Sequence, residues 1–327
     1  MSSHKIQAAL RTDGAELGIC PEFRSIQPQF DVRVFDSLPS TSTQVWNMLA
    51  QGAGAGTVAI AQRQTSGRGQ RGHCWQSEPG GLYLSLALEP SWPIAHGALL
   101  TCCSAWGIAT AFNNLGLPVQ IKWPNDLFFA GKKLGGILTE TKLAQPAAEI
   151  SSAKSGGNPL PCIKQAVVGV GINWHNRVPE TGITLAKIQR SMPNRAAQTA
   201  IDCLERLAAL VLKGILQGVY FQQQVGNQVF IKTYSNLLTQ TGRVVSISEG
   251  ALSAYLPENR FGQPSANAAG ASVANCSGKV IGISEEGYLR VALEESDADS
   301  AVAPRLMCKD HSNPRILLLK PSEIHVD

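Results

Sequence analysis

The sequence predicts an α+β protein with two domains, a larger one built on a mixed sheet and a smaller C-terminal β-barrel. Over the first two thirds of the chain, short apolar runs typical of strands are interspersed with long helical stretches. After about residue 241, short strands follow one another across turn-rich spacers, which is typical of a small barrel or sandwich. The 327 residues suffice for both domains. We expect a poorly ordered lead-in at residues 1–29, the main domain at 30–240 and the small domain at 241–327.

The main domain is expected to begin with a strand at residues 31–35, where apolar and polar side chains alternate. Ser40 and Thr41 offer N-cap oxygens to a helix that continues to residue 51. Residues 95–115 are Ala-rich and free of proline, which predicts a buried helix. The other elements expected here are helices at residues 196–216 and 221–238, and strands at 57–61, 82–88, 119–123, 127–129, 133–140 and 166–173.

Short β-branched runs bounded by glycine and polar turn residues predict the strands of the small domain. Clusters of Ala, Ser, Gly and Pro elsewhere predict loops. The strands expected in this domain are residues 242–247, 278–283, 287–293 and 316–319, and the long loops of the chain are expected at 145–161, 267–274 and 294–303.

Composition indicates a globular chain and argues against several classes of protein. Hydrophobic residues make up 44% and charged residues 16%, with a net charge of +4 and no dense Lys/Arg run that would indicate a nucleic-acid partner. The eight cysteines show no Cys-x-x-Cys spacing, which favours reduced thiols over disulfides or a zinc site. We see no apolar run of membrane-spanning length and no signal or transit peptide. These features predict a cytoplasmic protein.

The most informative stretch is a loop at residues 62–75, which lies between two expected strands. Glycine allows close approach of backbone N–H groups to an anion, and arginine adds a planar fork for a phosphate or carboxylate. The loop lacks the Gly-Lys-Ser/Thr ending of a P-loop, and no helix opens on it as the dinucleotide fingerprint requires. A soluble surface hairpin is the simplest alternative. The order of its central residues is Gly67, Arg68, Gly69, Gln70, Arg71, Gly72.

Downstream, further polar groups fall in turns and at strand ends. Asn125 and Asp126 are common turn residues, and Lys133 alone could be a surface charge. Together with two arginines, however, such groups suit a polyphosphate with Mg²⁺. Gly169 and Gly171 interrupt a strand, which often marks the close approach of a ligand. No nucleophile elbow or His–carboxylate pair indicates a hydrolase, so positioning and electrostatic stabilisation are expected to dominate. The downstream set is Lys122, Asn125, Asp126, Lys133 and Asn173.

In this order the motifs resemble those of biotin protein ligases. The resemblance extends from about residue 30 to residue 327. It implies a mixed-sheet catalytic domain of the biotin/lipoate ligase type followed by a small SH3-like β-barrel. The matching segments are Ser40-Thr41, Gln64, residues 67–72 with Trp75, and residues 122–126, 133–138 and 169–173.

The resemblance implies a two-step reaction. The carboxylate of biotin attacks the α-phosphate of ATP, which gives biotinyl-AMP and pyrophosphate. A lysine of a biotin carboxyl carrier protein, such as that of acetyl-CoA carboxylase, then takes the biotin and AMP is released. ATP and Mg²⁺ are the cofactors so implied, biotin is the substrate, and a homodimer is left open.

The pattern of that family also implies roles for individual residues. Lys133 and Arg68 would be catalytic, and Asp126 would lie by Mg²⁺, whereas Lys132 is the better candidate for a plain surface charge. The residues implied for biotin are Ser40, Thr41, Gln64, Gly67, Arg68, Trp75, Lys133, Gly136 and Gly169. Those implied for ATP or the adenylate are Arg68, Arg71, Lys122, Asn125 and Asn173.

The chain departs from the family pattern in its loop. Gln70 stands where arginine is usual, and His73 where arginine is common. Because glutamine is neutral and cannot make the same bidentate contact, either retention of the adenylate relies on Arg71 or the backbone, or the intermediate leaks.

Other readings remain open beside the ligase. Only about thirty weakly patterned residues precede the main domain, so we expect neither an N-terminal DNA-binding domain nor sequence-specific DNA binding. Attachment of lipoate or octanoate, and a biotin sensor without turnover, are the alternatives. Glu323 is a candidate contact of the small domain.

Overall fold

The computed structural model describes residues 1–144, 161–194, 196, 200–247, 276–293, 316–319 and 324–325. It divides into two compact units, Met1–Phe230 and Ile231–Asp327. The division therefore falls about ten residues before the boundary expected at 240/241. Residues 145–160, the loops expected at 267–274 and 294–303, and Glu323 lie outside the described residues.

The first unit is built on a seven-stranded mixed sheet, as the sequence predicts. β1 pairs with β2 in parallel, and all the other neighbouring strands pair antiparallel. In spatial order the strands are β1 (Asp31–Leu38), β2 (Thr57–Gln64), β3 (Leu82–Leu88), β7 (Ile163–Ile172), β6 (Lys132–Leu143), β5 (Asp126–Phe129) and β4 (Gln120–Lys122).

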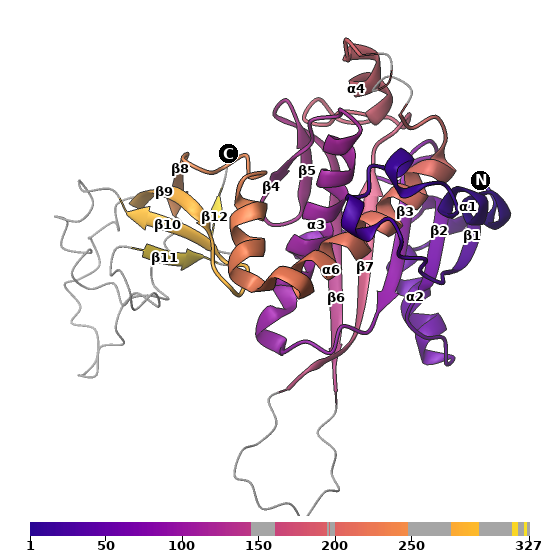
Figure 1. Ribbon diagram of the computed structural model, residues 1–327, viewed down its shortest axis with the longest axis horizontal. Coiled ribbons are helices and arrows are strands. Elements are labelled where there is room, and N and C mark those ends of the chain that lie inside the picture. Colours follow the sequence, from indigo (N-terminus) through magenta and orange to yellow (C-terminus); the bar gives the residue numbers. More distant parts are fainter. Residues whose placement is uncertain are drawn as a thin grey trace, which may run out of the picture. The chain divides into compact units, whose positions relative to one another are not determined.

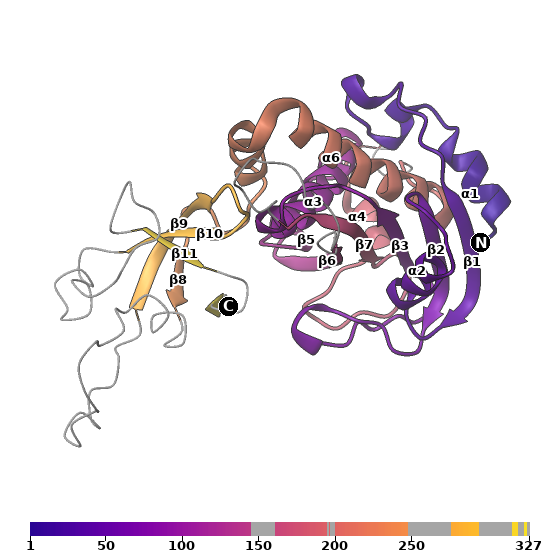
Figure 2. The ribbon, with the colours of Figure 1, turned by 90° about the horizontal axis from the view of Figure 1, so that it is seen from below.

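Helices cover the two faces of this sheet (Figures 1 and 2). α2 (Thr41–Ala50) packs on one face, where Val45 and Leu49 meet Ala59, Ala87 and Val167. α3 (Gly97–Asn114) and the first part of α6 (Leu204–Ser235) cover the opposite face. A short helix, α4 (Leu185–Ser191), follows β7. Two helices were expected here, and α6 does consist of two helices that meet at a kink at Gly226, where φ is 76°, so the break lies later in the chain than predicted.

α3 corrects one sequence expectation. Ile94–Asn114 spans 21 residues, and an 18-residue window of it has a mean hydropathy of 1.3, so it would be long and apolar enough to cross a membrane. An apolar run of this length was not expected from the sequence. Yet 67% of that window is buried inside the protein, as in the core helix of a soluble protein, so the helix is weak evidence for a membrane span.

The lead-in expected to be poorly ordered at residues 1–29 is a packed part of the first unit, so that prediction was wrong. It contains α1 (Ser3–Leu10) and two 3₁₀ turns, η1 (Gly14–Leu17) and η2 (Pro21–Phe23). Ile6 and Leu17 are fully buried. The backbone N–H of Cys20 donates to the Gln217 side chain on α6 at 3.0 Å. Burial of these apolar side chains orders a segment whose sequence pattern is weak.

The face of the sheet that carries α2 has a hollow at its centre. Across β3, β7 and β6, Ser85 pairs with Gly169, and Gly169 pairs with Leu138. In the next row, Gly171 pairs with Gly136. Partners across a sheet share one face, so small residues sit together where strands usually present bulky side chains. The missing side chains leave room for a cavity.

The second unit holds a five-stranded antiparallel sheet, consistent with the small barrel that the sequence predicts. Val280, Leu289, Val291 and Leu317 are buried and form its core. β12 was not expected, because two residues carry no readable pattern. In spatial order the strands are β11 (Ile316–Leu319), β10 (Leu289–Leu293), β9 (Cys276–Ile283), β8 (Val244–Ile247) and β12 (Ile324–His325).

Candidate active site

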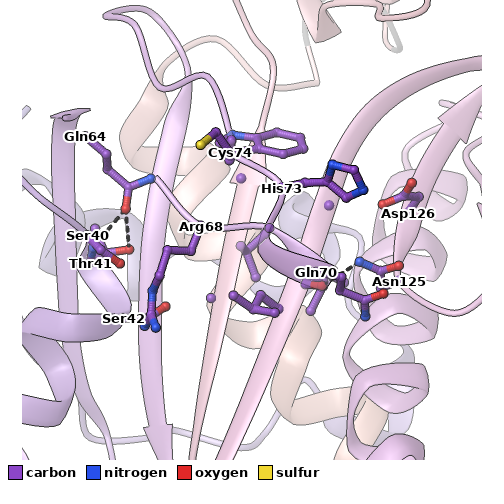
Figure 3. Close-up of a pocket in the computed structure, with 18 of the residues that line it drawn as sticks. Ser40, Thr41, Ser42, Gln64, Arg68, Gln70, His73, Cys74, Asn125 and Asp126 are labelled. Atoms are coloured by element: carbon purple, nitrogen blue, oxygen red, sulfur yellow. Dashed lines mark hydrogen bonds between the residues drawn. The ribbon is translucent and has the colours of Figure 1, made fainter. Parts of the chain in front are cut away.

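A cavity of about 270 Å³ lies over the hollow in the sheet. Its walls come from the start of α2, from the loop between β2 and β3, and from β5, β6 and β7 (Figure 3). Gly67, Lys122 and Asn173 do not line it, although the sequence placed them in the site. The predicted residues that do line it are Ser40, Thr41, Gln64, Arg68, Arg71, Trp75, Asn125, Asp126, Lys133, Gly136 and Gly169.

One end of the cavity is a network of hydroxyl and carboxamide groups. The backbone N–H of Thr41 donates to Gln64 Oε1 at 2.8 Å, and the Thr41 hydroxyl lies 3.2 Å from the same oxygen (Figure 3). Thr41 Oγ1 also lies 2.8 Å from Ser85 Oγ. Ser40 caps α2 by accepting from the N–H of Thr43, so its local role is the one expected from sequence. These bonds fix donors and acceptors before any ligand arrives.

Ser42 and Ser85 complete that network, although no sequence motif pointed to either as a site residue. Their hydroxyls lie 3.0 Å apart, and both residues are buried. A signal for Ser85 exists, since it is the single hydroxyl in the otherwise apolar run of β3 between Tyr83 and Leu88. A buried hydroxyl in an apolar strand requires a partner, which directs attention to the helix above it.

The glycine- and arginine-rich loop folds back on itself as a small hairpin. The N–H of Gly69 donates to His73 O at 2.7 Å, and the N–H of Trp75 donates to Gly67 O at 2.9 Å. Its tip needs left-handed backbone, with φ 56° at Arg71 and 74° at Gly72. We call residues 67–75 the site hairpin. A side chain on Gly67 would collide with the Trp75 carbonyl, which explains why glycine stands there.

Trp75 anchors the site hairpin on the glycines of the sheet. A Cβ at Gly171 would lie 2.5 Å from Trp75 Nε1, and one at Gly136 would lie 3.1 Å from Cζ3 of the ring. The Lys133 ammonium lies 5.2 Å from the centre of the same ring. Trp75 Nε1 is buried and has no hydrogen-bond partner among the residues that the structure describes. The indole therefore fits closely over a floor that only glycine provides.

Lys133 and Asp126 form an ion pair at the other end of the cavity. Lys133 Nζ lies 2.7 Å from Asp126 Oδ1. Burial raises the pKa of the Asp126 carboxyl above its ordinary value, although Lys133 and Lys122 act to lower it. The backbone of Lys133 is held by segment 181–183, since its N–H donates to Thr181 O and its carbonyl accepts from Ile183. These hydrogen bonds fix the backbone of Lys133, and its side chain lines the cavity.

Three residues assigned to the nucleotide have structural contacts of their own. The side chain of Asn125 donates to Ile137 O at 2.8 Å, which ties the β4–β5 turn to β6. The buried Asn173 side chain lies 3.4 Å from Lys133 O and accepts from Asn176 at 3.0 Å. Lys122 Nζ lies 5.8 Å from the centre of the Phe128 ring. Asn173 and Asn176 thereby support the strand that carries Lys133.

The donor set does not build a metal site from protein groups alone. Among the residues that the structure describes, no group of three or more His, Cys, Asp or Glu side chains could hold a metal ion. Asp126 provides one carboxylate in the cavity, beside the Asn125 carboxamide. That set suits Mg²⁺ whose other ligands are phosphate oxygens and water, because Mg²⁺ commonly uses only one or two carboxylates.

Known proteins resemble this chain in sequence and in fold. Residues 34–153 match the biotin/lipoate A/B protein ligase family. The fold is that of biotin protein ligase from Aquifex aeolicus. The structure in complex with biotin and ATP gives a TM-score of 0.55 at 23% identity, covering 81% of this chain and 92% of that one. The apo structure gives 0.56 at 20%, covering 91% and 99%. Over residues 34–153 the chain is therefore similar to the biotin/lipoate A/B protein ligase family.

Within that family, the curated relatives are named as biotin ligases. The bifunctional ligase/repressor BirA of Bacillus subtilis is 30% identical over 169 residues, which cover 51% of this chain and 47% of BirA. The biotin–[acetyl-CoA-carboxylase] ligase of Paracoccus denitrificans is 31% identical over 131 residues, covering 38% and 47%. The chain spans about half the length of the curated relatives it matches.

Proposed function

We propose that the chain is a biotin–protein ligase that activates biotin with ATP and transfers it to a lysine of a biotin carboxyl carrier protein. One observation carries the proposal. The Lys133–Asp126 pair, Arg68 and the Thr41–Gln64 network all face a single cavity. The cavity thus offers the Lys133 ammonium at one end and paired donors and acceptors at the other. A ligand with a polar ring and a carboxylate tail matches both ends.

In the first step, a carboxylate oxygen of biotin bonds to the α-phosphorus of ATP while the bond to pyrophosphate breaks. Two anions must approach each other, so fixed cations lower the barrier. Lys133 is the group for this, because it reaches the cavity from a fixed backbone and its ammonium is already oriented by Asp126. Mg²⁺, when bound with ATP, neutralises phosphate charge; Asp126 would hold it.

In the second step, the amine of the acceptor lysine attacks the carbonyl carbon of biotinyl-AMP. The C–O bond to AMP breaks with its electron pair, and the amine loses a proton. The site hairpin, with Arg68 and Arg71, would cover the adenylate until the acceptor arrives. A carrier domain of acetyl-CoA carboxylase or a similar carboxylase is the acceptor we infer, and the cytoplasm is the compartment we infer.

The test is transfer of labelled biotin from Mg-ATP and biotin to a carrier domain. Lys133→Ala should lower the rate about 10²- to 10³-fold, because a charge that follows the transition state is lost. Lys132→Ala is the matched control, since its ammonium donates to Glu180 O at the surface at 3.0 Å, and it should stay within about twofold of wild type.

Other outcomes would redirect the assignment. If wild type binds biotin tightly but transfers none, the chain is a sensor. If it transfers lipoate or octanoate in preference to biotin, the hydroxyl end of the cavity has been assigned to the wrong substrate. Equal loss in both lysine variants would remove Lys133 from the chemistry.

A further inference from the structure

Arg68 of the site hairpin makes an ion pair that the proposed reaction leaves unexplained. Its Nη2 lies 2.7 Å from Oε2 of Glu140, which neither the sequence motifs nor the cavity lining include. The distance is that of a charge-assisted hydrogen bond. The two side chains are 42% and 28% exposed, so water screens the pair only in part.

The position of Glu140 follows from the period of the strand. Side chains two residues apart on β6 share a face, so Gly136, Leu138 and Glu140 form one row along the cavity side. Glu140 pairs with Val167 across the sheet, one row beyond the pair of Leu138 with Gly169. It therefore stands at the end of the hollow, where a longer side chain can reach the site hairpin.

A second element orients Glu140. Trp46 Nε1 on α2 donates to the same carboxylate oxygen, Glu140 Oε2, at 3.2 Å. Trp46 follows Ser42 by four residues, so both lie on one face of α2. Lys142, next in the β6 row, places its Nζ 4.4 Å from the centre of the Trp46 ring. The carboxylate is thus held from two sides before it meets Arg68.

This pair constrains more than one side chain. Arg68 is bridged to Cys74 across the site hairpin, so fixing Arg68 also fixes the strand that returns to Trp75. The hairpin then has two attachments, Trp75 on the glycine floor and Arg68 on Glu140. The bond to Glu140 uses Nη2, and a guanidinium has five N–H donors. The remaining donors can serve a ligand in the cavity.

We propose that Glu140, oriented by Trp46, is a positioning residue that holds Arg68 and the site hairpin over the cavity and thereby slows release of the bound adenylate. This inference rests on the proposed function. It also supplies a retention device for a chain in which the neutral Gln70 lines the cavity.

The experiment measures release of pre-formed, labelled biotinyl-AMP from the full chain after a chase with unlabelled biotinyl-AMP. Glu140→Gln keeps the shape and an acceptor for Trp46 but loses the charge, and should release the adenylate about five- to tenfold faster. Trp46→Phe should accelerate release less. Asp31→Asn, which removes the charge of an exposed pair with Arg33 at 3.1 Å, is the control and should match wild type.

An Arg68→Ala background separates positioning from packing. If Glu140 acts through Arg68, then Glu140→Gln has no further effect on release in that background. Equal acceleration there, or release from Glu140→Gln as slow as or slower than wild type, would overturn the inference. Failure of wild type to retain biotinyl-AMP would overturn the inference alone, whereas failure to transfer biotin to a carrier domain would overturn the proposed function. Gln70→Arg in the same assay should slow release if the neutral loop position leaks.

Discussion

The environment of Asp126 disfavours the ionised form of its carboxyl group. Burial raises its pKa despite the ammonium 2.7 Å away, so the ionised form costs free energy in the folded state. A group with a raised folded pKa contributes stability below its unfolded value, and that contribution is lost as the pH rises through the folded pKa. At neutral pH the ionised Asp126 therefore lowers the free energy of unfolding, and a neutral residue of the same shape, such as asparagine, would remove this loss.

We predict that Asp126→Asn is at least as stable as wild type at pH 7, although its adenylation rate falls. The difference in free energy of unfolding should shrink as the pH is lowered towards the ordinary aspartate value near 3.8, where wild type becomes neutral too. Urea unfolding from pH 7 to pH 4 checks this. A variant clearly less stable than wild type at pH 7 would mean that the Lys133 pair outweighs the cost of burial.

At the scale of elements, Trp75 of the site hairpin packs directly on glycines of β6 and β7. A Cβ on Gly171 would lie 2.5 Å from Trp75 Nε1 and 2.6 Å from Cε2. Because an indole is rigid, the contact can be relieved only by moving the ring or the hairpin. The glycines of β6 and β7 therefore determine the position of the site hairpin.

We predict that Gly171→Ala displaces Trp75 and weakens biotin binding by about ten- to a hundredfold. Calorimetric titration with biotin measures the loss, and tryptophan fluorescence reports the altered ring environment. Gly54→Ala is the matched control, because no atom lies within 4 Å of its Cβ position and its φ is not left-handed. Unchanged biotin affinity in Gly171→Ala would show that the glycine floor is not needed.

The sequence motifs predicted many of the residues that line the cavity, but not the residues that hold those side chains in place. Motif order identified Gln64, Arg68 and Lys133, because glycine-rich and charged turns are readable locally. Ser85, Glu140 and Asn176 escaped notice, because each acts through a partner on another strand or helix. Such pairings depend on register and on helix placement, which a single sequence does not reveal.

At the scale of the whole molecule, periodicity predicted the seven strands and the buried helix α3, since long apolar patterns are the strongest signal. It failed at the N-terminus. The apolar side chains of residues 1–29 follow only a weak sequence pattern, and they gain stability from long-range packing. Gln217 shows this dependence, because it accepts from Cys20 and donates to Gly107 O on α3 at 2.6 Å.

Leu17 tests whether this segment belongs to the core of the first unit. Its side chain is fully buried, so Leu17→Ala should lower the free energy of unfolding by about 2–5 kcal/mol. Lys5→Ala, at an exposed position of α1, should change it by no more than about 0.5 kcal/mol. Urea unfolding of both variants measures this.

Biotin affinity separates stability from function in the same variants. The cavity lies on the α2 face of the sheet, whereas the segment is tied to α3 and α6, which cover the opposite face. Leu17→Ala should therefore bind biotin as wild type does wherever it is fully folded. A wild-type unfolding curve for Leu17→Ala would mean that the N-terminal packing adds nothing, and weakened biotin binding by the folded variant would mean that the segment also shapes the site.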